Sequence, residues 1–214
     1  TRARALGVRP PNRHLPRRLT AMDALFHLRD MIASLDVPLT DDLCARARLP
    51  RNDDLYALNG AAAPAPEELA GAYAGSTTLA GRVLLLRPFY VRAVLPALCA
   101  PGGGAAERNA CIAADTACLN SLARRLALSI HVATRKREAL PDALQTALGT
   151  GDPARVENAI TNLSVEAGVL ARVEARARKN GADADTVRRL AVLYADVLIP
   201  LSRKIQVHGL LAEA

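Results

Sequence analysis

The sequence predicts an all-α protein. Of its 214 residues, 50% are hydrophobic and only 3% are aromatic. Ala and Leu dominate the composition and runs of β-branched residues are short, which favours helices over sheets. Apolar residues recur at helical spacing along much of the chain, and no alternating pattern of useful length interrupts them. The length suits one globular helical bundle, or two small domains, with a sizeable core.

A basic segment precedes the predicted helices. Residues 1–18 contain six Arg, one His and three Pro but no acidic residue, a composition typical of an extended or mobile tail. We therefore divide the chain into this tail and a single helical domain over residues 19–214. The whole chain has a net charge of +7, and six of these charges lie in the tail. The domain is thus nearly neutral, and we do not expect it to bind nucleic acid.

The helices of the domain follow from apolar stripes and from residues that start or stop a helix. A stripe predicts the first helix over residues 19–36, which Pro38 is expected to end. Thr40 then resembles the N-cap of a continuation through Leu49. Residues 59–66, rich in Ala and Pro, are expected to form a linker. Further helices are predicted over residues 66–74, 79–98, 106–138, 141–148, 153–160, 164–179 and 183–211.

Pro and Gly residues punctuate these later helices. Pro88 is expected to kink its helix, and Pro200 lies inside the last one. The glycines at 102–104 predict a flexible loop, and Asn180-Gly181 is a helix stop signal. No apolar stretch is uninterrupted enough to span a membrane, so we expect no membrane association.

The segment over residues 118–136 is the most informative part of the chain, because it lacks Pro and Gly and is helical in pattern. Arg125 and Lys136 lie eleven residues apart in it. They therefore project from one face within about 20°, roughly 16 Å apart along the helix axis. Two cations on an otherwise apolar face suggest a pocket for a small anion. The alternative is that both simply point into water, as most Arg and Lys do.

Two further pairs have the i,i+4 spacing that places side chains on one helix face. Asn162 and Glu166 open one predicted helix, and Ser202 and Gln206 follow Pro200. Each pair has a simpler explanation. Asn162 suits a helix cap and Glu166 a first-turn acid, while the other pair suits a solvated surface.

Four segments, taken together and in order, resemble the all-helical chorismate mutases of fungi and plants. The resemblance covers Leu25 to Leu211 with a weakly matching middle. Its motifs are LRDMIASLDVPLTDDLCARARLPRNDDLY, CLNSLARRLALSIHVATRK, TNLSVEAGVLARVEARARKNG and LYADVLIPLSRKIQVHGLL. The resemblance implies an isomerase that rearranges chorismate to prephenate without a cofactor or metal, and a homodimer. A catalytically idle relative that works by binding a partner protein is the alternative.

The resemblance also implies residue roles. Arg29 and Arg125 match the arginines that hold the two carboxylates of chorismate. Lys136 matches the lysine that donates to the ether oxygen of the breaking C–O bond. Such donors fit the chemistry, because the reaction needs a dianion held in its reactive shape and negative charge stabilised on that oxygen.

The two i,i+4 pairs complete the implied catalytic and binding set. Asn162 and Glu166 match a pair near a carboxylate and the ring hydroxyl. Ser202 replaces the Thr usual in the family and keeps the hydroxyl with which a carboxylate contact can be made. Gln206 matches the second donor to the ether oxygen. Because Gln donates without being protonated, we expect activity at neutral pH.

One departure from the family concerns regulation. The loop that carries a Gly-Ser motif in regulated members reads Asn109-Ala110-Cys111 here. We therefore expect neither activation by tryptophan nor inhibition by tyrosine. Unregulated, shortened members resemble the secreted chorismate mutases of plant-associated fungi and nematodes. We accordingly expect secretion, with a host protein as a partner in that case; a cytoplasmic enzyme is the alternative.

Two sequence features bear on secretion. Cys99 and Cys111 flank a loop and could form a disulfide, although four free thiols are equally compatible with the spacing. Asn162-Leu163-Ser164 is a glycosylation sequon at the proposed site, where a glycan would block substrate. The sequon therefore argues against secretion.

Overall fold

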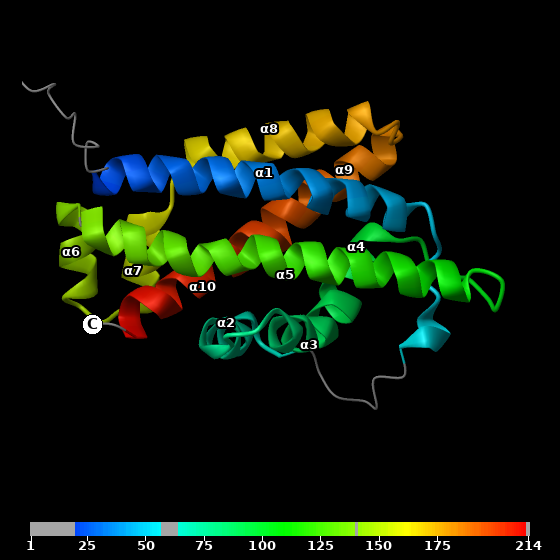
Figure 1. Cartoon of the computed structure of the whole chain (residues 1–214), viewed down its shortest axis with the longest axis horizontal. Coiled ribbons are helices and arrows are strands. Elements are labelled where there is room, and N and C mark those ends of the chain that lie inside the picture. Colours follow the sequence, from blue (N-terminus) through cyan, green and yellow to red (C-terminus); the bar gives the residue numbers. More distant parts are fainter. Residues whose placement is uncertain (1–19, 57–63, 140, 213–214) are drawn as a thin grey trace, which may run out of the picture.

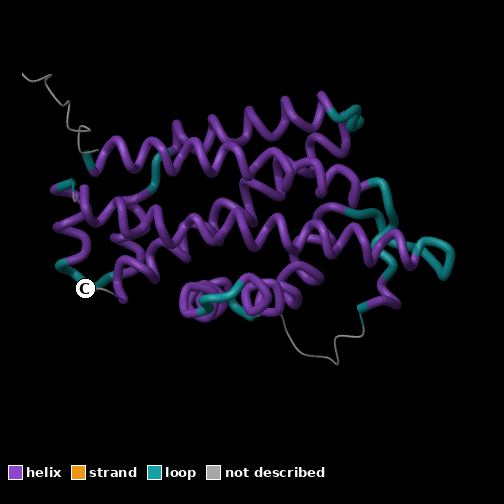
Figure 2. Tube along the Cα trace, in the orientation of Figure 1, coloured by secondary structure: helices purple, strands orange, loops and turns teal. Residues whose placement is uncertain are grey.

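The computed structural model describes residues 20–56, 64–139 and 141–212, and this part of the chain is helical with no strand (Figures 1 and 2). The all-α prediction is confirmed. The predicted tail lies outside the described residues. None of the described helices combines the length and apolar character needed to cross a membrane. The α-helices are α1 (Ala21–Ala47), α2 (Pro66–Gly75), α3 (Leu79–Phe89), α4 (Leu95–Leu98), α5 (Arg108–Ala139), α6 (Asp142–Leu148), α7 (Pro153–Ile160), α8 (Leu163–Lys179), α9 (Ala184–Leu193) and α10 (Ile199–Ala212).

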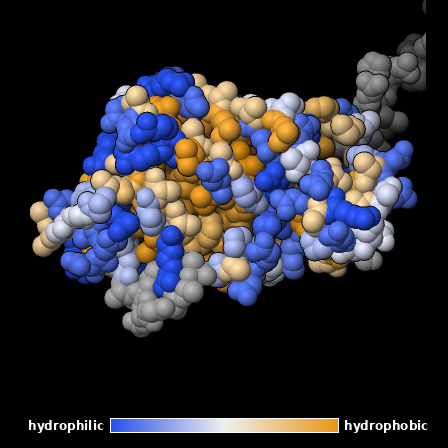
Figure 3. All heavy atoms as spheres, turned by 180° about the vertical axis from the view of Figure 1, so that it is seen from behind, coloured by the Kyte–Doolittle hydropathy of each residue, from blue (hydrophilic) through white to orange (hydrophobic). Residues whose placement is uncertain are grey.

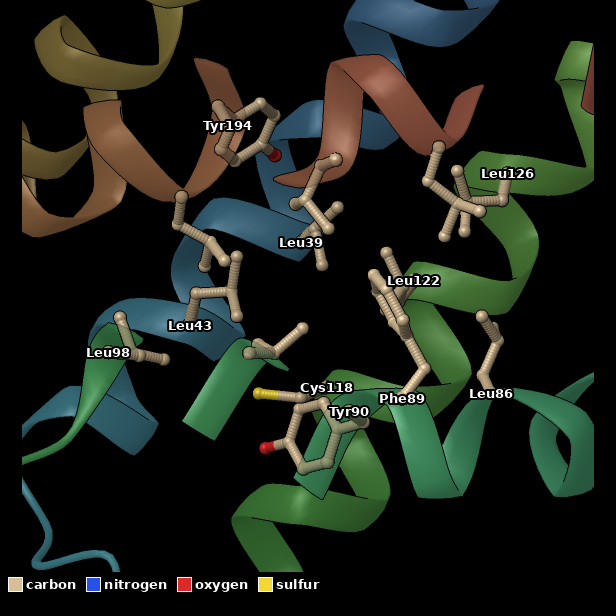
Figure 4. Close-up of a cluster of buried hydrophobic side chains, with 14 of the residues drawn as sticks. Leu39, Leu43, Leu86, Phe89, Tyr90, Leu98, Cys118, Leu122, Leu126 and Tyr194 are labelled. Atoms are coloured by element: carbon tan, nitrogen blue, oxygen red, sulfur yellow. The ribbon is translucent and has the colours of Figure 1, made fainter. Parts of the chain in front are cut away.

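The long helix α5 lies in the middle of the fold and packs against α1, α3 and α10 (Figure 1). Its most extensive neighbour is α1, which runs alongside it, and α10 also packs against it. Helix α8 covers the other side of α1, and α2 packs against α10. Leucines of α1 and α5 meet in the core beside Tyr90 and Tyr194 (Figure 4). The four cysteines are buried free thiols, so Cys99 and Cys111 are not bridged.

Helix α1 corrects one prediction, because Pro38 lies inside it and does not end it. Thr40 is not an N-cap, since its hydroxyl donates to the Asp36 carbonyl at 2.6 Å. A proline inside a helix costs about 3 kcal/mol. Burial on the far side of the proline offsets this cost: Leu39 and Leu43 are 1% and 2% exposed, and each fully buried Leu contributes about 1.5–3 kcal/mol.

The predicted helix over residues 79–98 and the last helix each contain a π-helical turn. These turns are η2 (Tyr90–Val94) and η3 (Tyr194–Leu198). The N–H of Leu95 donates to the Tyr90 carbonyl, and the N–H of Ile199 donates to that of Tyr194. In both places a proline comes next in the chain and lacks an N–H of its own. The wider π-helical turn accommodates the backbone hydrogen bond that the proline cannot make. The last helix therefore continues through Pro200 as predicted.

Two buried ion pairs join α1 to α5. The Arg46 Nε donates to Asp115 Oδ1 at 2.6 Å, and the Arg125 Nε donates to Asp36 Oδ1 at 2.9 Å. On each helix the Asp precedes the Arg by ten residues, so the pairs are reciprocal across two antiparallel helices. Sliding one helix by a turn would leave four charges buried without partners, which fixes the register of α1 against α5.

The Arg46 pair is the more enclosed of the two. Arg46 is 0% exposed, and its Nη1 and Nη2 donate to the carbonyls of Pro50 and Arg51 at 2.9 and 3.0 Å. The hydroxyl of Tyr90 donates to Asp115 Oδ1 at 2.9 Å, and Tyr56 donates to the other carboxylate oxygen. Every polar group of this network is therefore satisfied from within the fold.

Removing the Asp115 carboxylate should strongly destabilise the protein, because Arg46 would keep its charge in the core. We expect Asp115→Ala to lower the free energy of unfolding by about 3–5 kcal/mol, measured by urea denaturation. Glu138→Ala is the control. Its carboxylate pairs with Arg135 at the surface, where both side chains are about 45% exposed, and the expected loss is below about 1 kcal/mol. Equal losses in the two variants would contradict the assignment.

Candidate active site

A pocket opens between α1, α5, α8 and α10, beside the end of α7, and all seven residues predicted for the site line it. Aliphatic side chains form part of its wall, among them Ile32, Val132 and Val169. The structure therefore brings together residues that lie up to 177 positions apart in the sequence. The seven residues are Arg29, Arg125, Lys136, Asn162, Glu166, Ser202 and Gln206.

Arg125 lies on α5 and is only 7% exposed. Its Nε is held by Asp36, whereas its buried Nη1 makes no hydrogen bond within the described part of the chain. The ion pair fixes the guanidinium while leaving donors for another anion. Asp36 is not among the predicted site residues, because spacing within one helix does not reveal an ion-pair partner on another.

Lys136 lies three turns further along α5. Its Nζ donates to the Ile160 carbonyl at 3.0 Å and to Gln206 Oε1 at 2.9 Å. Burial, and secondly the charge of Arg29, lower the pKa of Lys136 to about 8, while Glu166 acts in the opposite direction. An ammonium group has three N–H bonds, so one remains for a ligand.

Gln206 and Ser202 face the pocket from α10. The Gln206 Nε2 donates to the Ser202 carbonyl at 3.2 Å and, at the longer distance of 3.5 Å, to the Ser202 hydroxyl. The Ser202 hydroxyl lies 2.8 Å from that of Ser129 on α5, and both residues are buried. Ser129 is a second partner that the sequence did not indicate. The simpler reading of this pair as a solvated surface is wrong, since Gln206 is only 8% exposed.

Asn162 is the N-cap of α8, as its simpler reading proposed. Its Oδ1 accepts hydrogen bonds from the Val165 N–H at 3.1 Å and from the Ser164 hydroxyl at 2.8 Å. The cap does not exclude a second role, because the residue is exposed at the pocket and its Nδ2 stays available. Glu166 follows one turn later and lies 3.4 Å from Nη1 of Arg203.

Three further cations surround the pocket. Arg29 on α1 is half-buried, and its Cζ lies 5.5 Å from the centre of the Phe26 ring. Arg172 and Arg203 also line the pocket, and neither was predicted. Arg172 lies on the same helix as Glu166, six residues later and about 120° further round it, so spacing from Glu166 did not indicate it. With Arg125 and Lys136 the cations outnumber the carboxylates, and the pocket suits a small anion.

Comparison with known sequences identifies the relatives of the chain. Residues 108–207 match the family described as chorismate mutase type II. The chorismate mutase of Schizosaccharomyces pombe is 29% identical over 133 residues, which are 58% of this chain and 53% of that protein. Chloroplastic chorismate mutase 3 of Arabidopsis thaliana is 31% identical over 136 residues, 57% of this chain and 43% of that protein. The chain thus spans about half the length of the curated relatives it matches.

Solved structures with the same fold include two chorismate mutases. The chloroplast enzyme from Zea mays has a TM-score of 0.70 at 21% identity, over 88% of this chain and 95% of that chain. The enzyme from Candida albicans, solved in complex with L-Trp, has a TM-score of 0.68 at 20% identity, over 90% of this chain and 93% of that chain. At these identities the likeness concerns the fold.

Proposed function

We propose that this chain, a relative of the all-helical chorismate mutases of fungi and plants, rearranges chorismate to prephenate within the pocket. The main support is the convergence of Arg125, Lys136 and Gln206 on one cavity, with unused hydrogen-bond donors on Arg125 and Lys136. These are the donor types that a dianionic substrate with a breaking C–O bond requires.

Each group has a distinct task in this proposal. Arg125 and Arg29 hold the two carboxylates, with Asn162 and Ser202 as additional polar contacts. This fixes chorismate in the shape in which the new C–C bond can form. No proton is transferred, so no general acid or base is needed.

Lys136, Gln206 and Glu166 act on the reacting part of the substrate. The remaining N–H bond of Lys136 and the amide of Gln206 donate to the ether oxygen and stabilise the negative charge that grows there as the C–O bond breaks. Their mutual hydrogen bond at 2.9 Å places both donors before substrate arrives. Glu166 accepts from the ring hydroxyl.

Removal of the Lys136 ammonium should therefore abolish most of the activity. We expect Lys136→Ala to lower kcat by about 10²–10³-fold, the typical effect of losing one donor to a developing oxyanion. The measurement is the loss of chorismate absorbance, with circular dichroism to verify helicity. Lys179→Ala, at the exposed end of α8, is the control and should keep wild-type kcat. A Lys136→Ala variant within a few-fold of wild type would exclude this role.

The pKa of Lys136 predicts the alkaline limit of the activity. Lysine donates as a cation below its pKa, so kcat/KM should fall as pH rises through about 8. Gln206 does not titrate and imposes no acid requirement. In Gln206→Glu the new carboxyl group must be protonated to donate, and the optimum should move to acid pH. Initial rates of both proteins across pH measure this; coinciding profiles would contradict the role of Gln206.

We further propose that aromatic amino acids do not regulate the activity. The support is the replacement of the Gly-Ser motif: Asn109, Ala110 and Cys111 stand in its place, in the first turn of α5, with Cys111 buried against Pro50. Two solved neighbours do hold such ligands, L-Trp in the Candida albicans enzyme and tyrosine in an allosteric site of AtCM1. Assays with saturating tryptophan or tyrosine should give unchanged kcat and KM; a change in either would contradict the proposal.

Assembly and location remain predictions of the sequence. For a homodimer, the support is the exposure of several large apolar side chains, including Leu84 on α3 at 68% and Val192 on α9 at 49%. Hydrophobic side chains gather near the centre of the face shown in Figure 3. Secretion, with a host protein as partner, and the cytoplasmic alternative are both proposals.

A further inference from the structure

Arg203 is a cation of the pocket to which the proposed reaction assigns no role. It lies on α10 between Ser202 and Gln206, and its side chain is 24% exposed. Its Nη1 lies 3.4 Å from Glu166 Oε1 on α8, and its Nε lies 3.4 Å from Glu157 Oε1 on α7. The guanidinium thus bridges two carboxylates on two helices, one in the pocket and one behind it.

A second cation shares the rear carboxylate. The Lys204 Nζ lies 3.4 Å from Glu157 Oε2 and 2.8 Å from Glu67 Oε1 on α2. Charges therefore alternate from α2 to the pocket wall, in the order Glu67, Lys204, Glu157, Arg203 and Glu166. Unlike Arg203, Lys204 does not line the pocket. The two neighbouring cations differ in access to substrate while sharing Glu157.

Glu166 poses an electrostatic problem that Arg203 solves. A carboxylate in the pocket repels a dianion, unless a cation offsets its charge. Arg203 pairs with Glu166 at 3.4 Å, and its second ion pair, with Glu157, restrains the guanidinium.

We propose that Arg203 is a positioning residue, which holds the Glu166 carboxylate at the pocket wall and offsets its charge so that a dianion binds beside it. The inference rests on the proposed function, in which Glu166 contacts the substrate. It assigns Arg203 to ground-state and transition-state binding alike, so its loss should raise KM and leave kcat nearly unchanged.

The test compares Arg203→Met with Lys204→Met, because both variants remove one cation that pairs with Glu157. We expect Arg203→Met to raise KM for chorismate about tenfold or more, as for a lost hydrogen bond to a charged group. Lys204→Met should leave KM unchanged, and Arg203→Lys should recover most of the loss. An equal rise in both methionine variants would show a general charge effect and overturn the proposal.

A double-mutant cycle asks whether Arg203 acts through Glu166. In the Glu166→Gln background, Arg203→Met should have no further effect on KM, whereas an undiminished tenfold effect would overturn the proposal. Thermal unfolding of each variant shows whether it folds. If Arg203→Met does not fold, Glu157→Gln takes its place and should also raise KM, with Arg203→Lys again close to the wild type.

Calorimetric binding of prephenate separates this proposal from the reaction itself. If the wild type binds prephenate but does not consume chorismate, the proposed function fails, and a tenfold weaker dissociation constant in Arg203→Met still supports the positioning role. If the wild type turns over chorismate and all variants match it in KM and in prephenate affinity, the positioning role fails alone. A wild type that neither binds nor reacts overturns both.

Discussion

The paired charges between α1 and α5 are the constraint from which the pocket follows. Asp36 holds Arg125 at one end of the interface, and Asp115 holds Arg46 about 15 Å away. Any other register of α1 against α5 is costly, because it would leave charged side chains in the core without partners. Once α5 is fixed in this way, helix geometry places Lys136 on the same face as Arg125, three turns later. The position of the pocket is thus a consequence of helix register.

The pocket combines rigid placement with unused hydrogen-bonding capacity. Buried partners hold Arg125, Lys136 and Gln206, yet Arg125 and Lys136 each retain a donor that no described residue takes. Donors fixed before the ligand arrives need little reorganisation, which is the arrangement expected where charge develops during a reaction. Charges outside the pocket also act on it, because Arg203 pairs both with Glu166 in the pocket and with Glu157 behind it.

Apolar stripes and helix caps in the sequence predicted where individual helices lie. The helix expected over residues 106–138 is observed as Arg108–Ala139, because stripes and caps are short-range features. The joint occurrence of the seven pocket residues was indicated only by resemblance to a family. The role of Asp36 could not be predicted, since a buried ion pair depends on which helices meet. Pro38 was misjudged for the same reason: its cost is visible in the sequence, whereas the burial of Leu39 beyond it is a tertiary effect.

The matching order of charges on α1 and α5 has a consequence for assembly during folding. A helix with Asp ten residues before Arg is complementary to an inverted copy of itself, the condition for an isologous contact. Each helix is therefore chemically competent to pair with its own counterpart from a second molecule. The covalent chain favours the internal partner by keeping it at high effective concentration. Refolding at high protein concentration weakens that advantage, and exchange of helices between molecules is the error expected of this fold.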